Sequence, residues 1–214
     1  MRIAILLPYK ENFSINKSGA VSLGVKDILK NTSNKNNTFV FGKTDEKKFL
    51  DKNYININFK KIFLKSHSKV YIKKFLEHER IKPSDIIEVH NRPAYIEQIK
   101  KYSSSKLILY FHNDPLTMSG SKTINDRKLL LSKVDHFIFN SNWSLERFKI
   151  GLNDFNYYKN NFSVVYQSVN KPKINFNKKK NVISFIGKLN RAKGYDVFGG
   201  SIIKILNKYK DWKA

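Results

Sequence analysis

The sequence contains no cysteine among its 214 residues. Disulfides, thiolate nucleophiles and cysteine-ligated zinc or iron–sulfur sites are therefore excluded. The segment LEHERIK does not supply a zinc-binding helix either, because Lys82 stands where H-E-x-x-H requires its second histidine.

Long hydrophobic runs are also absent. No stretch approaches the roughly 18 apolar residues that a membrane-spanning helix needs, and the apolar start, residues 1–8, is too short for the core of a signal peptide. We therefore expect a cytoplasmic protein.

Acidic residues are scarce. The chain has 17 Asp and Glu against 41 Lys and Arg, a formal net charge of +24. This excess predicts affinity for an anionic partner such as nucleic acid, lipid head groups or phosphorylated substrates. An A+T-biased genome would produce a similar Lys-, Asn- and Ile-rich composition with most lysines solvated, and both explanations remain open.

The residues that are present predict an α/β fold. Hydrophobic residues make up 41% of the chain, enough for a substantial core. Short β-branched or aromatic runs alternate with segments at helical spacing, which is typical of a Rossmann-like, doubly wound parallel sheet that binds ligands beyond the carboxyl ends of its strands. The predicted strands are 2–7, 38–41, 54–59, 85–90, 107–112, 136–140, 162–166 and 182–186. The predicted helices are 20–30, 68–81, 94–102, 125–134, 143–152 and 195–210, with Ser141 or Asn142 as N-cap of the fifth.

One change in composition divides the chain. Residues 170–181, NKPKINFNKKKN, are polar, basic and unperiodic, which is typical of a linker. We predict a complete domain over 1–169. Residues 182–214 would begin an incomplete second domain, because one strand and one helix cannot bury both their faces alone.

The first candidate binding loop is KSGAVSLG, residues 17–24. Gly19 permits close backbone approach, and the following helix N-terminus offers free N–H groups to an anion. An ordinary loop–helix junction would look the same.

Two further loops follow predicted strands. In VHNRP, His90, Asn91 and Arg92 crowd the end of one strand, and helix capping explains only Asn91 and the following proline. We predict that these three residues bind a ligand.

YFHNDP repeats the arrangement with His112, Asn113 and Asp114. Such a histidine could donate a hydrogen bond to a sugar hydroxyl or phosphate, or transfer a proton near neutral pH. We predict a functional role for His112 and ligand binding by Asn113 and Asp114. Turn capping by Asp114 and simple packing of His112 remain the alternative.

The last motif is GKLNRAKG, residues 187–194. Lys188, Arg191 and Lys193 lie close together just before a predicted helix. Cations beside a helix N-terminus suit a diphosphate, although the motif is neither a P-loop nor G-x-G-x-x-G.

Together these motifs resemble the N-terminal half of retaining glycosyltransferases of the GT-B fold, often called family four. SGAVSLGVKDIL resembles the family's glycine loop and first helix, FHNDP its active-site histidine segment, FNSNWSLERF its strand, serine turn and helix, and VVYQSVN its domain-closing V-I-x-N-G-V-D. FIGKLNRAKGYD is similar to its G-R-L-x-x-x-K-G turn. The resemblance covers essentially the whole chain.

The resemblance implies a role for each motif. Lys188 and Lys193 would hold the donor diphosphate, Gly19 would face the donor phosphates or the acceptor, and His112 would contact the transferred sugar as the catalytic residue. The residues that would bind the acceptor or the sugar are His90, Asn91, Arg92, Asn113 and Asp114. The HNRP and HNDP pair is most similar to members that build lipopolysaccharide or other surface glycans. Lys188 replaces the usual Arg and gives up bidentate geometry, and Gln167-Ser168 replaces the usual Asn-Gly.

The resemblance also implies the partners: a nucleotide-sugar donor, a glycan or lipid-linked acceptor, and peripheral contact with anionic membrane, with no metal or other cofactor. The family's two glutamates separated by seven residues do not occur here. We therefore expect these 214 residues to be an inactive fragment on their own. The rival hypotheses are a basic nucleic-acid-binding module, in which aromatic residues stack on bases, and a non-catalytic glycan-binding domain.

Overall fold

The computed structural model divides into two compact units, residues 1–169 and 170–214. Most of the predicted linker, 170–181, lies outside the described residues. The structure describes residues 1–59, 66–152, 161–168, 173, 175 and 179–214.

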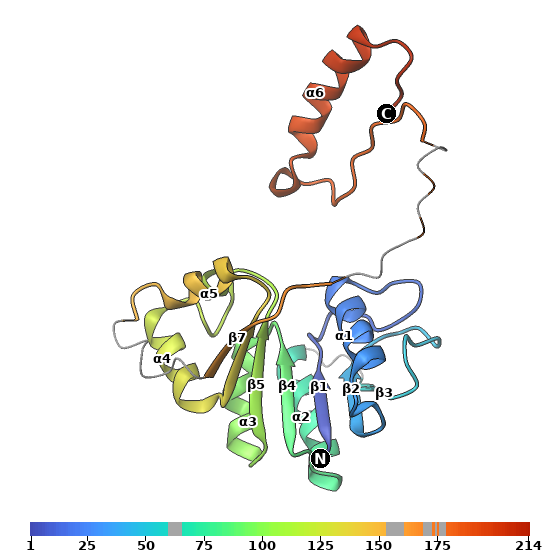
Figure 1. The fold of residues 1–214 in the computed structure, drawn as a ribbon. Helices are drawn as coiled ribbons and strands as arrows, with labels where there is room; N and C mark the ends of the chain where they lie inside the picture. The colour runs from blue at the N-terminus through green and yellow to red at the C-terminus, as the bar shows by residue number, and fades with distance from the viewer. Residues whose placement is uncertain (60–65, 153–160, 169–172, 174, 176–178) are drawn as a thin grey trace. The chain divides into compact units, whose positions relative to one another are not determined.

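The first unit is built on a parallel sheet (Figure 1). Within the described residues, seven strands pair in the order β3-β2-β1-β4-β5-β6-β7. The strands are β1 (Ile3–Leu6), β2 (Thr38–Gly42), β3 (Tyr54–Asn56), β4 (Ile86–His90), β5 (Lys106–Phe111), β6 (His136–Phe139) and β7 (Phe162–Val164). The predicted Rossmann-like α/β fold is confirmed, and the strand order reverses direction between β1 and β4.

Helices cover the two faces of this sheet unequally (Figure 1). The α-helices of the first unit are α1 (Ala20–Asn31), α2 (His67–Ile81), α3 (Ile96–Tyr102), α4 (Ile124–Lys133) and α5 (Asn142–Lys149). Helix α1 packs on β1 and β2 from one side, whereas α2 to α5 share the other side in one large apolar cluster. Among the described residues, no helix is both long and apolar enough to cross a bilayer.

Local side-chain contacts explain where some elements begin and end. The Ser141 hydroxyl accepts a hydrogen bond from the Ser144 amide at 3.2 Å, which confirms Ser141 as the N-cap of α5. β3 ends at Asn56, three residues earlier than predicted. The Asn56 side chain bonds the Thr44 backbone N–H and C=O, both at 2.9 Å, which links the end of β3 to the loop after β2.

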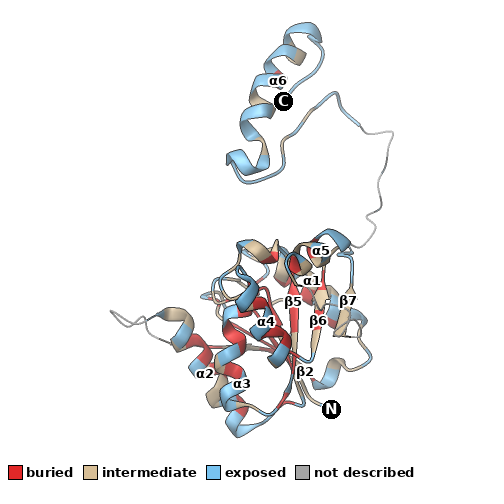
Figure 2. Ribbon diagram, turned by 90° about the vertical axis from the view of Figure 1, so that its left-hand side faces the viewer, coloured by how far each residue is buried: buried red, intermediate tan, exposed pale blue. Residues whose placement is uncertain are grey.

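Figure 2 shows buried residues along the strands and on the helices that cover them. Most large aromatic side chains of the first unit belong to this core. Five phenylalanine rings gather where α5 covers β5, β6 and β7: Phe111, Phe137, Phe139, Phe148 and Phe162. Burial of these rings leaves them unavailable for stacking on nucleic-acid bases.

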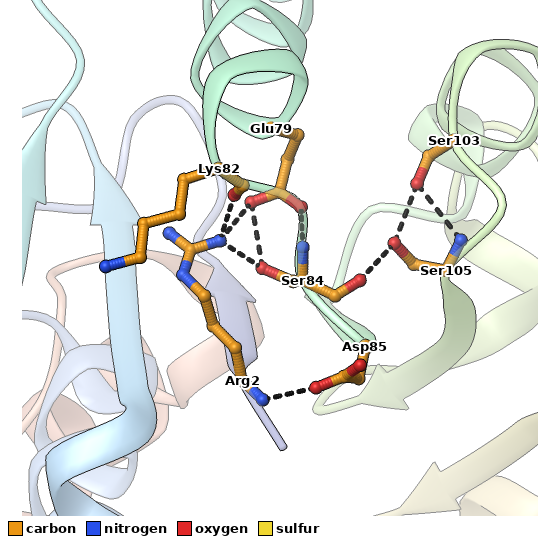
Figure 3. Close-up of polar contacts among 7 residues, drawn as sticks. All are labelled: Arg2, Glu79, Lys82, Ser84, Asp85, Ser103 and Ser105. Atoms are coloured by element: carbon orange, nitrogen blue, oxygen red, sulfur yellow. Dashed lines mark hydrogen bonds and ion pairs between the residues drawn. The ribbon is translucent and has the colours of Figure 1, made fainter.

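The amino-terminal edge of the sheet is fastened by a buried ion pair (Figure 3). Arg2 Nη1 lies 3.1 Å from Glu79 Oε1 and donates to the Ser84 hydroxyl at 2.6 Å. Glu79 also accepts from the Ser84 backbone N–H at 2.9 Å. The cluster therefore joins the start of β1 to the end of α2 and the loop before β4.

The second unit contains the predicted basic turn and helix. A single 3₁₀ turn, η6 (Arg191–Lys193), leads into α6 (Tyr195–Lys208). In place of the strand predicted over 182–186, the structure has one β-bridge, between Val182 and Lys213. A strand needs a neighbour along its whole length, and among the described residues only this short pairing is available.

Candidate functional site

His90 and His112 meet at the carboxyl edge of the sheet. β4 and β5 are adjacent and parallel, with His90 opposite Tyr110 in register. Because side chains alternate along a strand, Tyr110 and His112 point to the same face as His90. His90 Nδ1 and His112 Nε2 are hydrogen-bonded at 2.8 Å. The two HN motifs of the sequence thus form one site, beside the point where the strand order reverses.

The histidine pair is the centre of a longer hydrogen-bonded chain. His90 Nε2 bonds Glu88 Oε1 at 2.5 Å, and Gln167 Nε2 lies 3.2 Å from His112 Nδ1. His90 is fully buried, and the ring of Tyr110 stacks on His112 with centroids 4.2 Å apart. Both ring nitrogens of His112 therefore have partners within the protein.

The surroundings of His112 favour its neutral form. Burial, with a smaller contribution from His90, lowers the pKa of His112 from 6.5 to about 3. Burial and the nearby Glu88 carboxylate raise the pKa of Tyr110. At neutral pH His112 is therefore an uncharged imidazole, which suits it to hydrogen bonding rather than to acting as a cation.

Asn91 holds the two strand ends in place. Its φ of 54° is in the left-handed region, where asparagine is one of the few tolerated residues. Its N–H donates to Tyr110 O at 2.7 Å, and its Oδ1 accepts from the His112 N–H at 3.3 Å. Asn140 donates to His112 O at 2.9 Å from the end of β6. The backbone around His112 is thus fixed by three neighbouring strands.

Arg92, two residues after His90, lines a groove. Its Nη1 donates to Asn91 O at 2.7 Å. The groove, of about 960 Å³, lies between α2, α3 and the loop after β5, and Lys69 and Lys101 also line it. Three cationic side chains and the carboxylate of Glu97 therefore border this space.

Asp114 and Asn113 differ in their surroundings. Asp114 accepts from the Leu116 N–H at 3.0 Å and forms an ion pair with Arg147, whose Nη2 lies 2.9 Å from Oδ2. These contacts, Arg147 first, lower the pKa of Asp114. Asn113 is exposed beside the site. The Asp114 side chain therefore stabilises the loop after β5 through these two contacts.

Gly19 is the N-cap of α1, and its neighbour is a carboxylate. A Cβ on Gly19 would lie 2.5 Å from Glu11 Oε1, so a side chain at this position would displace the Glu11 carboxylate. The same oxygen accepts from the Ser22 N–H at 3.0 Å. An anion of the protein itself thus occupies part of the helix N-terminus that the sequence analysis assigned to a ligand.

In the second unit, the basic turn presents its cations outward. Asn190 Oδ1 accepts from the Lys193 N–H at 3.1 Å, and Gly194, with a φ of 73°, turns the chain into α6. Lys188, Arg191 and Lys193 are all exposed. The turn therefore combines a helix N-terminus with three accessible positive charges.

Sequence reasoning missed Glu88, Gln167 and Glu11. Glu88 could have been noticed, because a carboxylate within the apolar run DIIEVH needs a buried partner. Gln167 lies 55 residues from His112, and Glu11 lies 11 residues before Ser22. No local pattern marks either contact.

No protein-family model matches the chain, and a search of curated proteins finds no relative. Solved structures do resemble it. Anabaena HepE (Alr3699), solved in complex with UDP-glucose, superposes with a TM-score of 0.53 at 13% identity, over 79% of this chain and 44% of HepE.

Sucrose-phosphate synthase from Thermosynechococcus elongatus superposes with a TM-score of 0.63 at 9% identity, over 96% of this chain and 60% of the synthase. The chain thus spans about half the length of these proteins. At such identities the likeness shows a shared fold.

Proposed function

We propose that this chain forms the acceptor-side domain and the first diphosphate-binding turn of a GT-B glycosyltransferase. The observation that carries the proposal is the His90–His112 pair, which lies at the carboxyl edge of a doubly wound sheet where the strand order reverses. HepE, which shares this fold, has been solved with UDP-glucose and with UDP and glucose. A nucleotide-sugar is accordingly the donor that we propose.

The proposed reaction moves a sugar from the nucleotide-sugar to a hydroxyl, with retention at the anomeric carbon and with the departing phosphate taking the proton of the acceptor. Lys188, Arg191 and Lys193 neutralise the departing diphosphate, so that no metal ion is required. His112, neutral and hydrogen-bonded, contacts the transferred sugar.

The acceptor side is proposed for the groove beside Arg92. Its three cations suit the phosphates of a lipid-linked acceptor of surface-glycan biosynthesis, such as lipopolysaccharide. The excess of 41 Lys and Arg over 17 Asp and Glu would favour peripheral contact with anionic membrane, at about 1 kcal/mol for each well-placed cation. The proposed location is the cytoplasmic face of the membrane.

The test is release of a nucleoside diphosphate from a panel of nucleotide-sugars, UDP-glucose first, by the protein that contains this chain. Lys193→Ala should lower turnover by orders of magnitude, since it removes charge stabilisation of the leaving group. Lys204→Ala, which removes an exposed lysine from within α6, is the matched control. Equal rates for the two variants would remove Lys193 from the site, and no turnover with any donor would contradict the proposed function.

A further inference from the structure

Glu88, His90, His112 and Gln167 form a row of hydrogen-bonded side chains. The two end residues, Glu88 and Gln167, indicate which atom donates in each bond of the row. The Glu88 carboxylate can only accept, so His90 Nε2 carries a proton and donates it. At the other end, the Gln167 side chain turns its amide nitrogen, and not its amide oxygen, towards His112 Nδ1. An amide nitrogen only donates, so in this orientation His112 Nδ1 is the acceptor. The bond between the rings then runs from His112 Nε2–H to His90 Nδ1. In this arrangement each ring carries a proton on Nε2 and accepts at Nδ1.

We infer that Glu88 and His90 are positioning residues that fix the tautomer of His112, and that the ligand group bound at His112 Nδ1 is a hydrogen-bond donor. This inference rests on the proposed glycosyl transfer. A sugar hydroxyl can donate to the Nδ1 lone pair. A diphosphate oxygen, which only accepts, cannot.

Burial determines which end of this row of side chains a ligand can reach. His90 is fully buried, and the Glu88 side chain is only 15% exposed. Gln167, by contrast, is exposed on the segment that follows β7. A sugar hydroxyl therefore takes the place of the Gln167 amide at Nδ1, while the buried end of the chain keeps the tautomer unchanged.

The tautomer is tested by ¹⁵N NMR of the imidazole nitrogens in the 214-residue chain, because protonated and unprotonated ring nitrogens have well-separated chemical shifts. In the wild type we expect an unprotonated Nδ1 and a protonated Nε2 on His112. Glu88→Gln should let both tautomers populate, because a carboxamide donates as well as accepts; the two His112 shifts then move towards each other.

The matched control is His136→Gln. His136 lies at the level of Glu88 on the same sheet face but bonds Ser163 instead, at 2.7 Å. The His136→Gln variant should therefore show unchanged His112 chemical shifts. A proton on His112 Nδ1 in the wild type, or unchanged shifts in folded Glu88→Gln, would overturn the inference. If Glu88→Gln fails to fold, the wild-type spectrum decides alone.

The ligand class is tested with two probes, glucose and inorganic pyrophosphate, at millimolar concentration. Glucose should shift His112 Nδ1 and the Gln167 side-chain amide, whereas pyrophosphate should not. A response of Nδ1 to pyrophosphate, or to neither probe, would overturn hydroxyl recognition. If the protein turns over a nucleotide-sugar but His112 carries its proton on Nδ1, this inference is wrong and the proposed function stands. If His112 carries its proton on Nε2 but no nucleotide-sugar is turned over, the proposed function is wrong and the tautomer assignment stands.

Discussion

Replacing His112 by glutamine should remove a large part of the protein's sensitivity to mild acid. In the folded state the pKa of His112 is about 3, against an ordinary value of 6.5. Between these values the unfolded chain binds a proton that the folded chain does not. Stability is therefore lost as the pH falls below 6.5. From pH 7 to pH 5 the loss attributable to His112 is about 2 kcal/mol.

The assay is urea unfolding of the wild type and His112→Gln, followed by circular dichroism at pH 7 and pH 5. For an unfolding slope of about 2 kcal/mol/M, the wild-type midpoint should fall by roughly 1 M more than that of the variant. Contributions of groups that titrate alike in both proteins cancel in this comparison. Equal losses in the two proteins would refute a partly buried His112 that stays neutral at pH 5.

Two further substitutions test contacts away from the histidine pair. Glu79→Ala leaves Arg2 as an unpaired, largely buried cation and should destabilise the first unit by about 3–5 kcal/mol. The control Glu77→Ala removes a partly exposed ion pair with Lys74 in the same helix and should lower the stability far less, because such pairs contribute little. Equal effects of the two substitutions on thermal unfolding would contradict the reasoning. Asp114→Asn weakens the pair with Arg147, which lowers the pKa of Asp114. The variant should therefore melt below the wild type at pH 7, and the difference in melting temperature should shrink as the pH falls through that pKa. A difference that persists in acid would count against this ion pair.

The sheet could be predicted from the sequence because each strand is a compact run of β-branched or aromatic residues between polar breaks. The short 3₁₀ turn η3 (Pro115–Thr117) was missed, and η2 (Pro93–Tyr95) was included in the helix predicted over 94–102. Each begins at a proline, which a sequence pattern interprets equally well as a loop or a first helical residue. The strand predicted over 182–186 was wrong because a strand needs a neighbouring strand to pair with. The sequence of the segment does not indicate whether such a neighbour is present.

The candidate site was predictable only in part. His90 and His112 were identified because each ends a strand, and adjacent parallel strands bring their ends together. Their exact partners were not identified. Glu88 shares a strand face with His90, but the choice of ring nitrogen depends on side-chain torsion angles. Gln167 reaches His112 through tertiary structure that has no local signature.

The division into two units has a practical consequence for fluorescence. The sequence contains two tryptophans, and one falls in each unit: Trp143 in the first and Trp212 in the second. Replacing either by phenylalanine leaves a single intrinsic emitter that reports on one unit. Emission spectra of the two variants recorded along the same denaturant series would therefore separate the unfolding of the sheet from that of the basic turn and its helix, without any attached dye.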